Sequence, residues 1–344
     1  MRSAYLESIG RLVLTDAPKP EITRPDEVLI QVKRVGVCGS EVHAFEGTHP
    51  FRLAPVTLGH EMAGIVTAVG SEVTRFQPGD RVIVDPQWSC GECDFCRAGD
   101  INLCLKKKVL GTQVWPGAFG EFITSPQEAV FALPEALDFE QGSLIEPLTV
   151  AVHVAQRASL RPGLSLVVLG SGSIGGMVAG VARAYGVEQV IAVDIRQHCL
   201  DAARERMGAT HDFLLPDPDL ERKVKDLTGG GADVVVVAAD DPTLVDLALD
   251  LIKKRGTVVL VALLTAEPLT FLGFKVVIKE AHIIGTTMSN LDDVAKAIEL
   301  AASGKVDVSG IHTHTLPFEE VQRGMEMAAS KTDGAIKVIL SYES

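Results

Sequence analysis

The second half of the chain alternates between continuous apolar runs and amphipathic stretches. Residues 164–170 read LSLVVLG, residues 173–186 have helical periodicity and end at a glycine, and residues 187–194 read VEQVIAVD. The alternation continues to residue 287 through the apolar runs DFLL, ADVVVVAA, GTVVLVALL and AHIIGTT. Apolar strands that alternate with helices predict a parallel sheet covered on both faces. Six such strands are typical of a doubly wound, dinucleotide-binding α/β domain.

The first part of the chain differs in composition and in its pattern of polarity. It is rich in Gly and Pro, and short stretches alternate in polarity, as where Val28, Ile30 and Val32 share one face. This pattern predicts a mostly-β domain of short strands. Two amphipathic helices at 291–304 and 318–331 and a last strand at 335–342 follow the α/β region. We therefore expect a first domain at 1–152, an α/β domain at 153–287, and a return to the first domain at 288–344.

The turn after the first α/β strand carries a glycine pattern. Gly170, Gly172 and Gly175 form G-x-G-x-x-G between a strand and a helix. The first glycine permits the tight turn, the second leaves room for a pyrophosphate, and the third allows close helix–sheet packing. Asp194 ends the next strand, where its carboxylate can accept a hydrogen bond from a ribose 2′-OH, which favours NAD over NADP. Arg196 could instead pair with a phosphate, and a Gly-rich turn that binds nothing remains the alternative.

Composition narrows the class of protein. The net charge of −13 disfavours nucleic acid as a partner. No apolar run approaches the roughly 20 residues of a membrane span, and the N-terminal MRSAYLESIG lacks a secretory pattern. We expect a cytoplasmic protein, in which clustered cysteines are more often metal ligands than disulfides.

Four of the six cysteines lie within fifteen residues. Cys90, Cys93, Cys96 and Cys104 have the spacing C-x2-C-x2-C-x7-C, inside a lobe expected at 88–106. Four thiolates complete a tetrahedral zinc shell and leave no open position, so a structural zinc is predicted. An iron–sulfur cluster uses the same ligands, and a nucleic-acid-binding knuckle would want basic neighbours such as the lysines at 106–108.

A second set of zinc ligand types is scattered along the chain. Cys38 lies in CGSEVH, His60 and Glu61 lie in LGHEM, and Glu146 precedes a proline. A lone cysteine is usually a core residue, but together these four side chains supply a thiolate, an imidazole and carboxylates. Their spacing alone does not establish that they meet.

The combined motifs resemble a known family across essentially the whole chain. CGSEVH, GHE, the four-cysteine segment, EP and the glycine motif, in this order, resemble the zinc-dependent medium-chain dehydrogenase/reductase superfamily. Glu146 before Pro147 is similar to its polyol branch, which includes sorbitol, xylitol and sugar-acid dehydrogenases, whereas threonine dehydrogenases have Asp-Pro there. The resemblance implies a GroES-like catalytic domain interrupted by a Rossmann domain.

The same resemblance implies roles for individual residues. Cys38 and His60 would bind a catalytic zinc, with Glu61 and Glu146 sharing the other positions or water replacing one of them, so two zinc ions are expected per subunit. Ser40 would receive the proton of the alcohol and His43 would pass it on. Cofactor contacts are expected at Gly170, Gly172, Ile174, Gly175, Asp194, Arg196, Val261, Leu263 and Met288.

The substrate remains open at this point. Sorbitol dehydrogenases carry Arg-Tyr where this chain has Met288-Ser289, which argues against sorbitol itself. Pocket candidates on the loop before His60 are Phe45, His49, Phe51 and Arg52. Arg52 could bind a carboxylate, which would suit a sugar acid, or it could be a surface charge.

We expect an NAD-dependent oxidation of a secondary alcohol of a polyol, sugar acid or cyclitol to the ketone. The alternatives are a threonine dehydrogenase-like enzyme, a biosynthetic ketone reductase, or an inactive scaffold acting as a binding module. Relatives are usually dimers or tetramers, so a homo-oligomer is expected.

Overall fold

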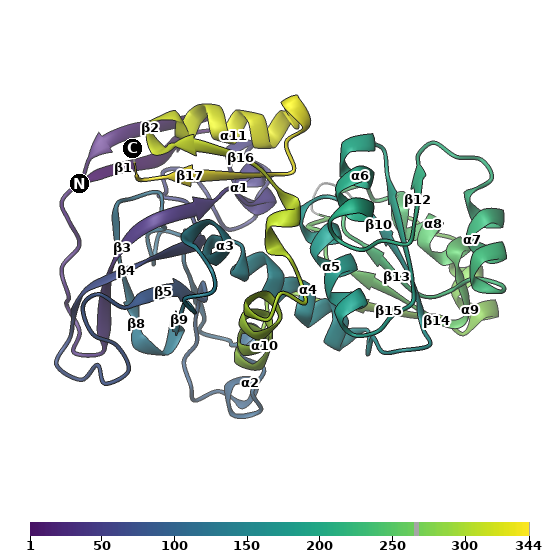
Figure 1. Ribbon diagram of the computed structural model, residues 1–344, viewed down its shortest axis with the longest axis horizontal. Helices are drawn as coiled ribbons and strands as arrows, with labels where there is room; N and C mark the ends of the chain where they lie inside the picture. Colours follow the sequence, from purple (N-terminus) through teal and green to yellow (C-terminus); the bar gives the residue numbers. More distant parts are fainter. Residues whose placement is uncertain (265–267, 344) are drawn as a thin grey trace. The chain divides into compact units, whose positions relative to one another are not determined.

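The computed structural model describes residues 1–264 and 268–343, which divide into two units. Unit 1 contains Met1–Glu146, Asn290–Ala302 and the residues from His312 onward, and unit 2 contains Pro147–Ser289 and Ser303–Ile311. The helices after residue 290 therefore return largely to the unit that contains the N-terminus (Figure 1).

A seven-stranded sheet forms the framework of unit 1. Its order is β16-β17-β3-β4-β5-β9, with β8 pairing beside β3, and all neighbours are antiparallel except β16 and β17. The strands are β3 (Glu27–Gly36), β4 (Glu61–Val69), β5 (Arg81–Val84), β8 (Phe122–Pro126), β9 (Val130–Ala132), β16 (His312–Pro317) and β17 (Lys337–Ser341). Two small pairs accompany it, β1 (Arg2–Ser8) with β2 (Arg11–Asp16), and β6 (Gln87–Trp88) with β7 (Lys108–Val109).

The core of unit 1 follows from the alternation in its strands. Val28, Ile30 and Val32 of β3 all point into one buried cluster, which also contains Leu58 and Phe119. The helices assigned wholly to this unit are α1 (Gly39–Phe45), α2 (Asp94–Arg97), α3 (Phe139–Ser143), α10 (Leu291–Ala302) and α11 (Val321–Ser330). Helix α4 (Ile145–Arg157) begins at the boundary between the two units.

Unit 2 contains the predicted six-stranded parallel sheet. Its order is β12-β11-β10-β13-β14-β15, and helices lie against its faces (Figure 1). The strands are β10 (Ser165–Leu169), β11 (Gln189–Asp194), β12 (His211–Leu214), β13 (Ala232–Val237), β14 (Ile252–Leu260) and β15 (His282–Gly285). The helices are α5 (Ser173–Ala184), α6 (Gln197–Glu205), α7 (Leu220–Thr228), α8 (Leu244–Leu251) and α9 (Gly273–Lys279). This order reverses beside β10, which is the position where dinucleotides bind in such sheets.

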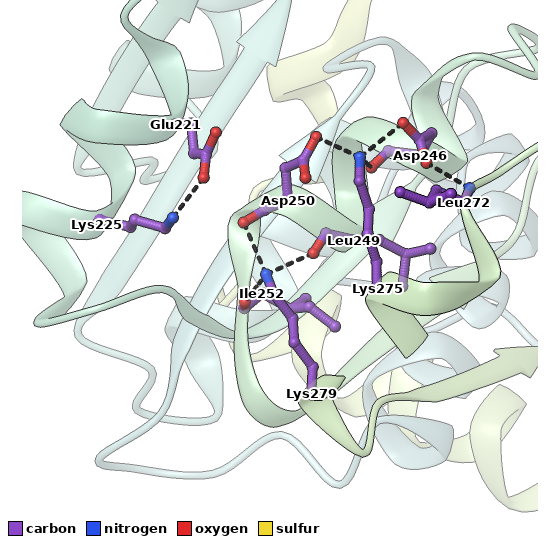
Figure 2. A network of polar contacts seen from close by, with 9 residues as sticks. All are labelled: Glu221, Lys225, Asp246, Leu249, Asp250, Ile252, Leu272, Lys275 and Lys279. Carbon is purple, nitrogen blue, oxygen red and sulfur yellow. Dashed lines mark hydrogen bonds and ion pairs between the residues drawn. The ribbon is translucent and has the colours of Figure 1, made fainter. Parts of the chain in front are cut away.

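Two lysines attach α9 to α8 (Figure 2). Lys275 Nζ lies 2.7 Å from carboxylate oxygens of both Asp246 and Asp250. Lys279 Nζ donates to the carbonyls of Leu249 at 2.6 Å and Ile252 at 2.7 Å, at the C-terminal end of α8. A cation is favourable there because the last carbonyls of a helix lack intrahelical partners. The polar side of α9 is therefore held against α8, whereas Phe274, Val277 and Ile278 of α9, and Leu272 just before it, remain exposed.

No helix among residues 1–264 and 268–343 is long and apolar enough to cross a membrane.

Candidate active site

Sheet register brings together three of the predicted metal ligands. Strands β3 and β4 are antiparallel, and their pairing sets Gly36 opposite Glu61. Cys38, two residues beyond Gly36, and His60, just before β4, therefore lie at the same end of the sheet. One ligand atom each from Cys38, His60 and Glu61 lies within 4.8 Å of the others. A thiol, an imidazole and a carboxylate at this separation fit a zinc ion.

Glu61 is held by a lysine from the end of the chain. Both of its carboxylate oxygens accept from Lys337 Nζ at 2.7 Å, and this lysine also donates to the Val37 carbonyl at 3.2 Å. Burial opposes the charge of Lys337, but the Glu61 carboxylate and Cys38 outweigh it and raise the lysine's pKa. A Cβ on Gly36 would collide with Glu61 Oε2, so a larger residue there would displace this carboxylate. Sequence reasoning missed Lys337, which β17 brings beside β3.

Glu41 orients the other two ligands. Its Oε1 accepts from His60 Nδ1 at 2.8 Å and from the Gly59 N–H at 2.6 Å, and its Oε2 accepts from the Cys38 N–H at 3.0 Å. Burial would raise the pKa of Glu41, but His60 and these hydrogen bonds lower it overall. With Nδ1 engaged, His60 presents Nε2 to a metal. Sequence reasoning missed Glu41 too, although a glutamate three residues into a helix typically folds back onto the helix N-terminus.

Glu146 lies outside the group formed by Cys38, His60 and Glu61. It lies in the first turn of α4. Burial and repulsion by Glu61 raise the pKa of its carboxyl group to about 7, although His60 and Lys337 act in the opposite direction. The Glu146 carboxyl group is therefore close enough to the cluster to interact with its charges. A cation at the cluster would favour its ionised form.

The predicted proton path starts on α1. Ser40 and His43 are three residues apart on this helix, so they share a face. The Ser40 hydroxyl accepts from Arg52 Nη1 at 2.5 Å, and His43 Nδ1 lies 2.9 Å from Thr48 Oγ1. Arg52 is only 6% exposed, so the alternative that it is a surface charge is wrong.

The other pocket candidates differ in their surroundings. Phe45 packs into the core of unit 1, whereas Phe51 is 76% exposed. His49 is buried, and its Nδ1 accepts from the backbone N–H groups of Phe51 and Arg52, both at 3.0 Å. Burial and the nearby Arg52 charge lower the pKa of His49 to about 4, so its ring is neutral near pH 7.

The four-cysteine segment forms a separate cluster. The sulfur atoms of Cys90, Cys93, Cys96 and Cys104 all lie within 4.8 Å of one another, and none of these cysteines forms a disulfide. Cys93 and Cys96 are 3.5 Å apart and Cys90 and Cys96 are 3.9 Å apart. Zn–S bonds of about 2.3 Å in a tetrahedron place sulfurs roughly 3.8 Å apart, so the cluster fits zinc. Backbone N–H groups of Cys96 and Leu105 lower the pKa of Cys93 to about 6, whereas desolvation raises that of Cys96 to about 11.

The predicted cofactor residues of unit 2 follow the ends of its parallel strands. Gly170 has φ +92° after β10, and a Cβ on Gly175 would collide with the Gly170 carbonyl, so these two positions require glycine. The space around Gly172 is open. Asp194 ends β11 and accepts from the Ser171 N–H at 2.7 Å and the Arg196 N–H at 2.9 Å. A carboxylate fixed beside a glycine turn fits the ribose of a dinucleotide.

The remaining cofactor candidates lie along the same edge. Ile174 is in the first turn of α5, Val261 and Leu263 follow β14, and Met288 follows β15. The carboxyl ends of parallel strands meet at one edge of a sheet, so these residues lie at the same edge as the glycine turn.

Comparisons with known proteins agree with this geometry. The alcohol dehydrogenase GroES-like domain matches residues 24–135, and the zinc-binding dehydrogenase family matches residues 173–303. D-xylulose reductase A of Aspergillus niger is 34% identical over 94% of this chain and 92% of its own length. The chain belongs to the zinc-dependent medium-chain dehydrogenase/reductase superfamily. Sorbitol dehydrogenase of Bacillus subtilis is 34% identical over 99% of this chain and 97% of its own length, which supports the polyol branch.

Comparison with a solved structure confirms the fold. An Escherichia coli oxidoreductase of unknown specificity, described as involved in membrane biogenesis, superposes with a TM-score of 0.93 at 31% identity, covering 99% of this chain and 98% of the other. The predicted GroES-like and Rossmann domains are thereby confirmed, as is the assignment to the polyol dehydrogenase branch.

Proposed function

We propose that this chain oxidises a secondary alcohol of a polyol, sugar acid or cyclitol to the ketone, with NAD as the hydride acceptor. The observation that carries the proposal is the group formed by Cys38, His60 and Glu61, with the Ser40 hydroxyl on the helix that begins beside Cys38. A zinc ion held here would supply the Lewis acidity that lowers the pKa of an alcohol, and NAD would take up the hydride.

The other steps, metal binding and proton transfer, are assigned to residues of the chain. Cys38 and His60 are the proposed zinc ligands, with Glu61 and Glu146 as carboxylates that complete the shell or leave one position to water. Ser40 accepts the alcohol's proton through its hydroxyl oxygen, and His43 on the same helix face passes it on. Glu41 fixes the tautomer of His60, so Nε2 is the nitrogen that faces the metal.

The cofactor assignment rests on unit 2. Asp194 is proposed to hold the adenosine ribose, and its negative charge would repel a 2′-phosphate, which favours NAD over NADP. The four-cysteine cluster is proposed to hold a second, structural zinc, which gives two zinc ions per subunit. None of the six cysteines forms a disulfide, which supports a reducing, cytoplasmic location.

A homo-oligomer, a dimer or a tetramer, is also proposed. Its support is the group of exposed apolar side chains Phe274, Val277 and Ile278 of α9, with Leu272 just before it, in the segment that leads into β15 at the edge of the sheet. An unpaired strand edge next to exposed apolar side chains is suited to pairing with a second copy. Light scattering of the purified protein should give a mass at least twice that of one chain, and a monomer at micromolar concentration would contradict it.

The test of the reaction is NADH formation from NAD and a panel of polyols, sugar acids, cyclitols and threonine. A response to one group of secondary alcohols is the expected result. A response to threonine alone would favour the threonine dehydrogenase-like alternative, and a response only in the reverse direction, with ketones and NADH, would favour a reductase. NAD binding without turnover in either direction would favour the inactive scaffold.

A further inference from the structure

Arg52 lies beside the proposed proton acceptor but has no part in the proton path. A guanidinium group has five N–H donors. Nη1 of Arg52 donates to Ser40 Oγ at 2.5 Å, Nη2 donates to the Leu110 carbonyl at 3.3 Å, and the buried Nε has no hydrogen-bond partner. Because buried polar groups almost always have partners, an orphaned donor on a side chain that is 6% exposed calls for an explanation.

The charge of Arg52 also lacks a direct counter-ion. Within residues 1–264 and 268–343, no carboxylate lies within the 4.0 Å that defines an ion pair with its guanidinium. Lys337 is the instructive contrast, because this equally buried cation has both oxygens of Glu61 at 2.7 Å. Glu41 and Glu146 interact with the Arg52 charge only through space. A buried charge is costly unless it is paired, so the position is prepared for an anion.

The place of Arg52 limits where that anion can sit on a substrate. If Ser40 accepts the proton of the reacting alcohol, the alcohol oxygen lies a hydrogen bond away from Ser40 Oγ. Nη1 of Arg52 lies 2.5 Å from the same oxygen, so the guanidinium is within roughly 5 Å of the alcohol oxygen. An oxyanion bound to it would be attached about one to three carbons from the reacting centre. A planar guanidinium suits carboxylate or phosphate, which accept two parallel N–H bonds.

We propose that Arg52 forms an anion subsite, and that the substrate is a secondary alcohol with a carboxylate or phosphate close to the reacting carbon. This inference rests on the proposed function and narrows it from neutral polyols to sugar acids or sugar phosphates. Arg52 then determines specificity, and its bond to Ser40 couples anion binding to the position of the proton acceptor.

The experiment compares substrates of the same configuration that differ in the group at one terminal carbon, which is neutral in one and anionic in the others. For several stereoisomers, kcat/KM is measured with NAD for an alditol, for the aldonate of the same configuration, and for the alditol 1-phosphate. An anionic member should exceed its neutral partner at least about tenfold, the advantage expected of hydrogen bonds to a charged group. The aldonate and phosphate arms identify which oxyanion the subsite prefers.

Variants at Arg52 then link the preference to this side chain. In Arg52→Gln the ratio of anionic to neutral kcat/KM should fall toward one, mostly through KM. Arg52→Lys should retain part of this ratio, because lysine keeps the positive charge but lacks the two parallel N–H donors of a guanidinium group. Circular dichroism and Tm confirm folding, and competitive inhibition of the wild-type enzyme by inorganic phosphate is a readout that needs no variant.

Several outcomes would overturn the subsite. They are equal kcat/KM for neutral and anionic partners in the wild type, or an equal loss for both classes in Arg52→Gln, which would reduce Arg52 to a positioning residue for Ser40. In each of these cases turnover of neutral alcohols would leave the proposed function intact. Absence of turnover with every member of the panel would instead overturn the proposed function itself.

Discussion

The two candidate metal sites of this chain are built in opposite ways. The four-cysteine cluster takes all its ligands from one stretch of fifteen residues, Cys90 to Cys104, which has only the four-residue helix α2 and a short turn as regular structure. The second site takes Cys38 from the N-cap of α1, just after β3, His60 from the residue before β4, and Glu61 from the start of β4. One site is local in sequence, whereas the other exists only because a sheet has folded.

Their supporting contacts differ in the same way. In the cysteine cluster the sulfurs accept mainly from nearby backbone, as where Cys104 Sγ accepts from the N–H groups of Cys90 at 3.3 Å and Lys106 at 3.4 Å. In the second site, buried side chains hold the ligands: Glu41 accepts a hydrogen bond from His60, and Lys337 donates hydrogen bonds to Glu61. We infer that metal organises the lobe, whereas the sheet organises the second site before metal arrives. The two sites should therefore fail differently when a ligand is removed.

The largest expected effect is on turnover, from Cys38→Ser. Loss of a thiolate ligand should lower kcat/KM by about a thousandfold or more, because Lewis acid assistance is worth several kcal/mol. The Tm should change little, since the core of unit 1 and its hydrogen bonds hold this region. NADH formation and differential scanning calorimetry measure the two quantities.

Cys199→Ser is the matched control for that variant. Cys199 is a buried cysteine of α6, distant in sequence from both ligand sets. Its replacement should leave turnover within about twofold, as expected of a site without a named role. Full activity in Cys38→Ser would refute the assignment of the second site.

The second effect is on stability, from Cys93→Ser. Structural zinc contributes folding energy directly, so we expect a loss of about 3 kcal/mol or more. For a domain of this size that loss lowers Tm by roughly 6 °C or more. The activity of the molecules that remain folded should be nearly unchanged, in contrast to Cys38→Ser. An unchanged Tm together with lost activity would reverse the roles of the two sites.

The contrast between the sites also explains how much the sequence could reveal. The parallel strands and the cysteine cluster were predicted from the residues alone, because apolar runs and ligand spacing are local signals. The meeting of Cys38 with His60 depends on the pairing of Gly36 with Glu61, which spacing does not encode, so it required a resemblance to a family.

The residues that support the second site were harder still to predict from the sequence. Lys337 reaches Glu61 across 276 positions of sequence through the pairing of β17 with β3. Nothing around Lys337 distinguishes it from a surface lysine next to a strand. Arg52 was noticed, but its burial depends on how the loop before His60 packs, so a surface charge could not be excluded from the residues.

The smallest of the three effects is on metal affinity, from Glu41→Gln. It tests whether the second site is formed before the metal binds or only when the metal binds. In Glu41→Gln, an amide NH₂ replaces one of the oxygens that accept from His60, Gly59 and Cys38, so at least one donor would face another donor. Loss of such a supporting carboxylate typically costs about 10- to 100-fold in metal affinity.

Zinc retained against a graded series of chelators measures this affinity. Glu92→Gln, beside the cysteine cluster, is the control, because the Glu92 side chain is exposed and its carboxylate pairs with Lys106. We expect Glu41→Gln to release the zinc of the second site at a lower chelator concentration than the wild type, while the zinc of the four-cysteine cluster stays bound. Glu92→Gln should match the wild type. Equal retention in all three proteins would mean that the ligands of the second site need no preorganisation by Glu41, and the contrast drawn between the two sites would then rest on Lys337 and the sheet alone.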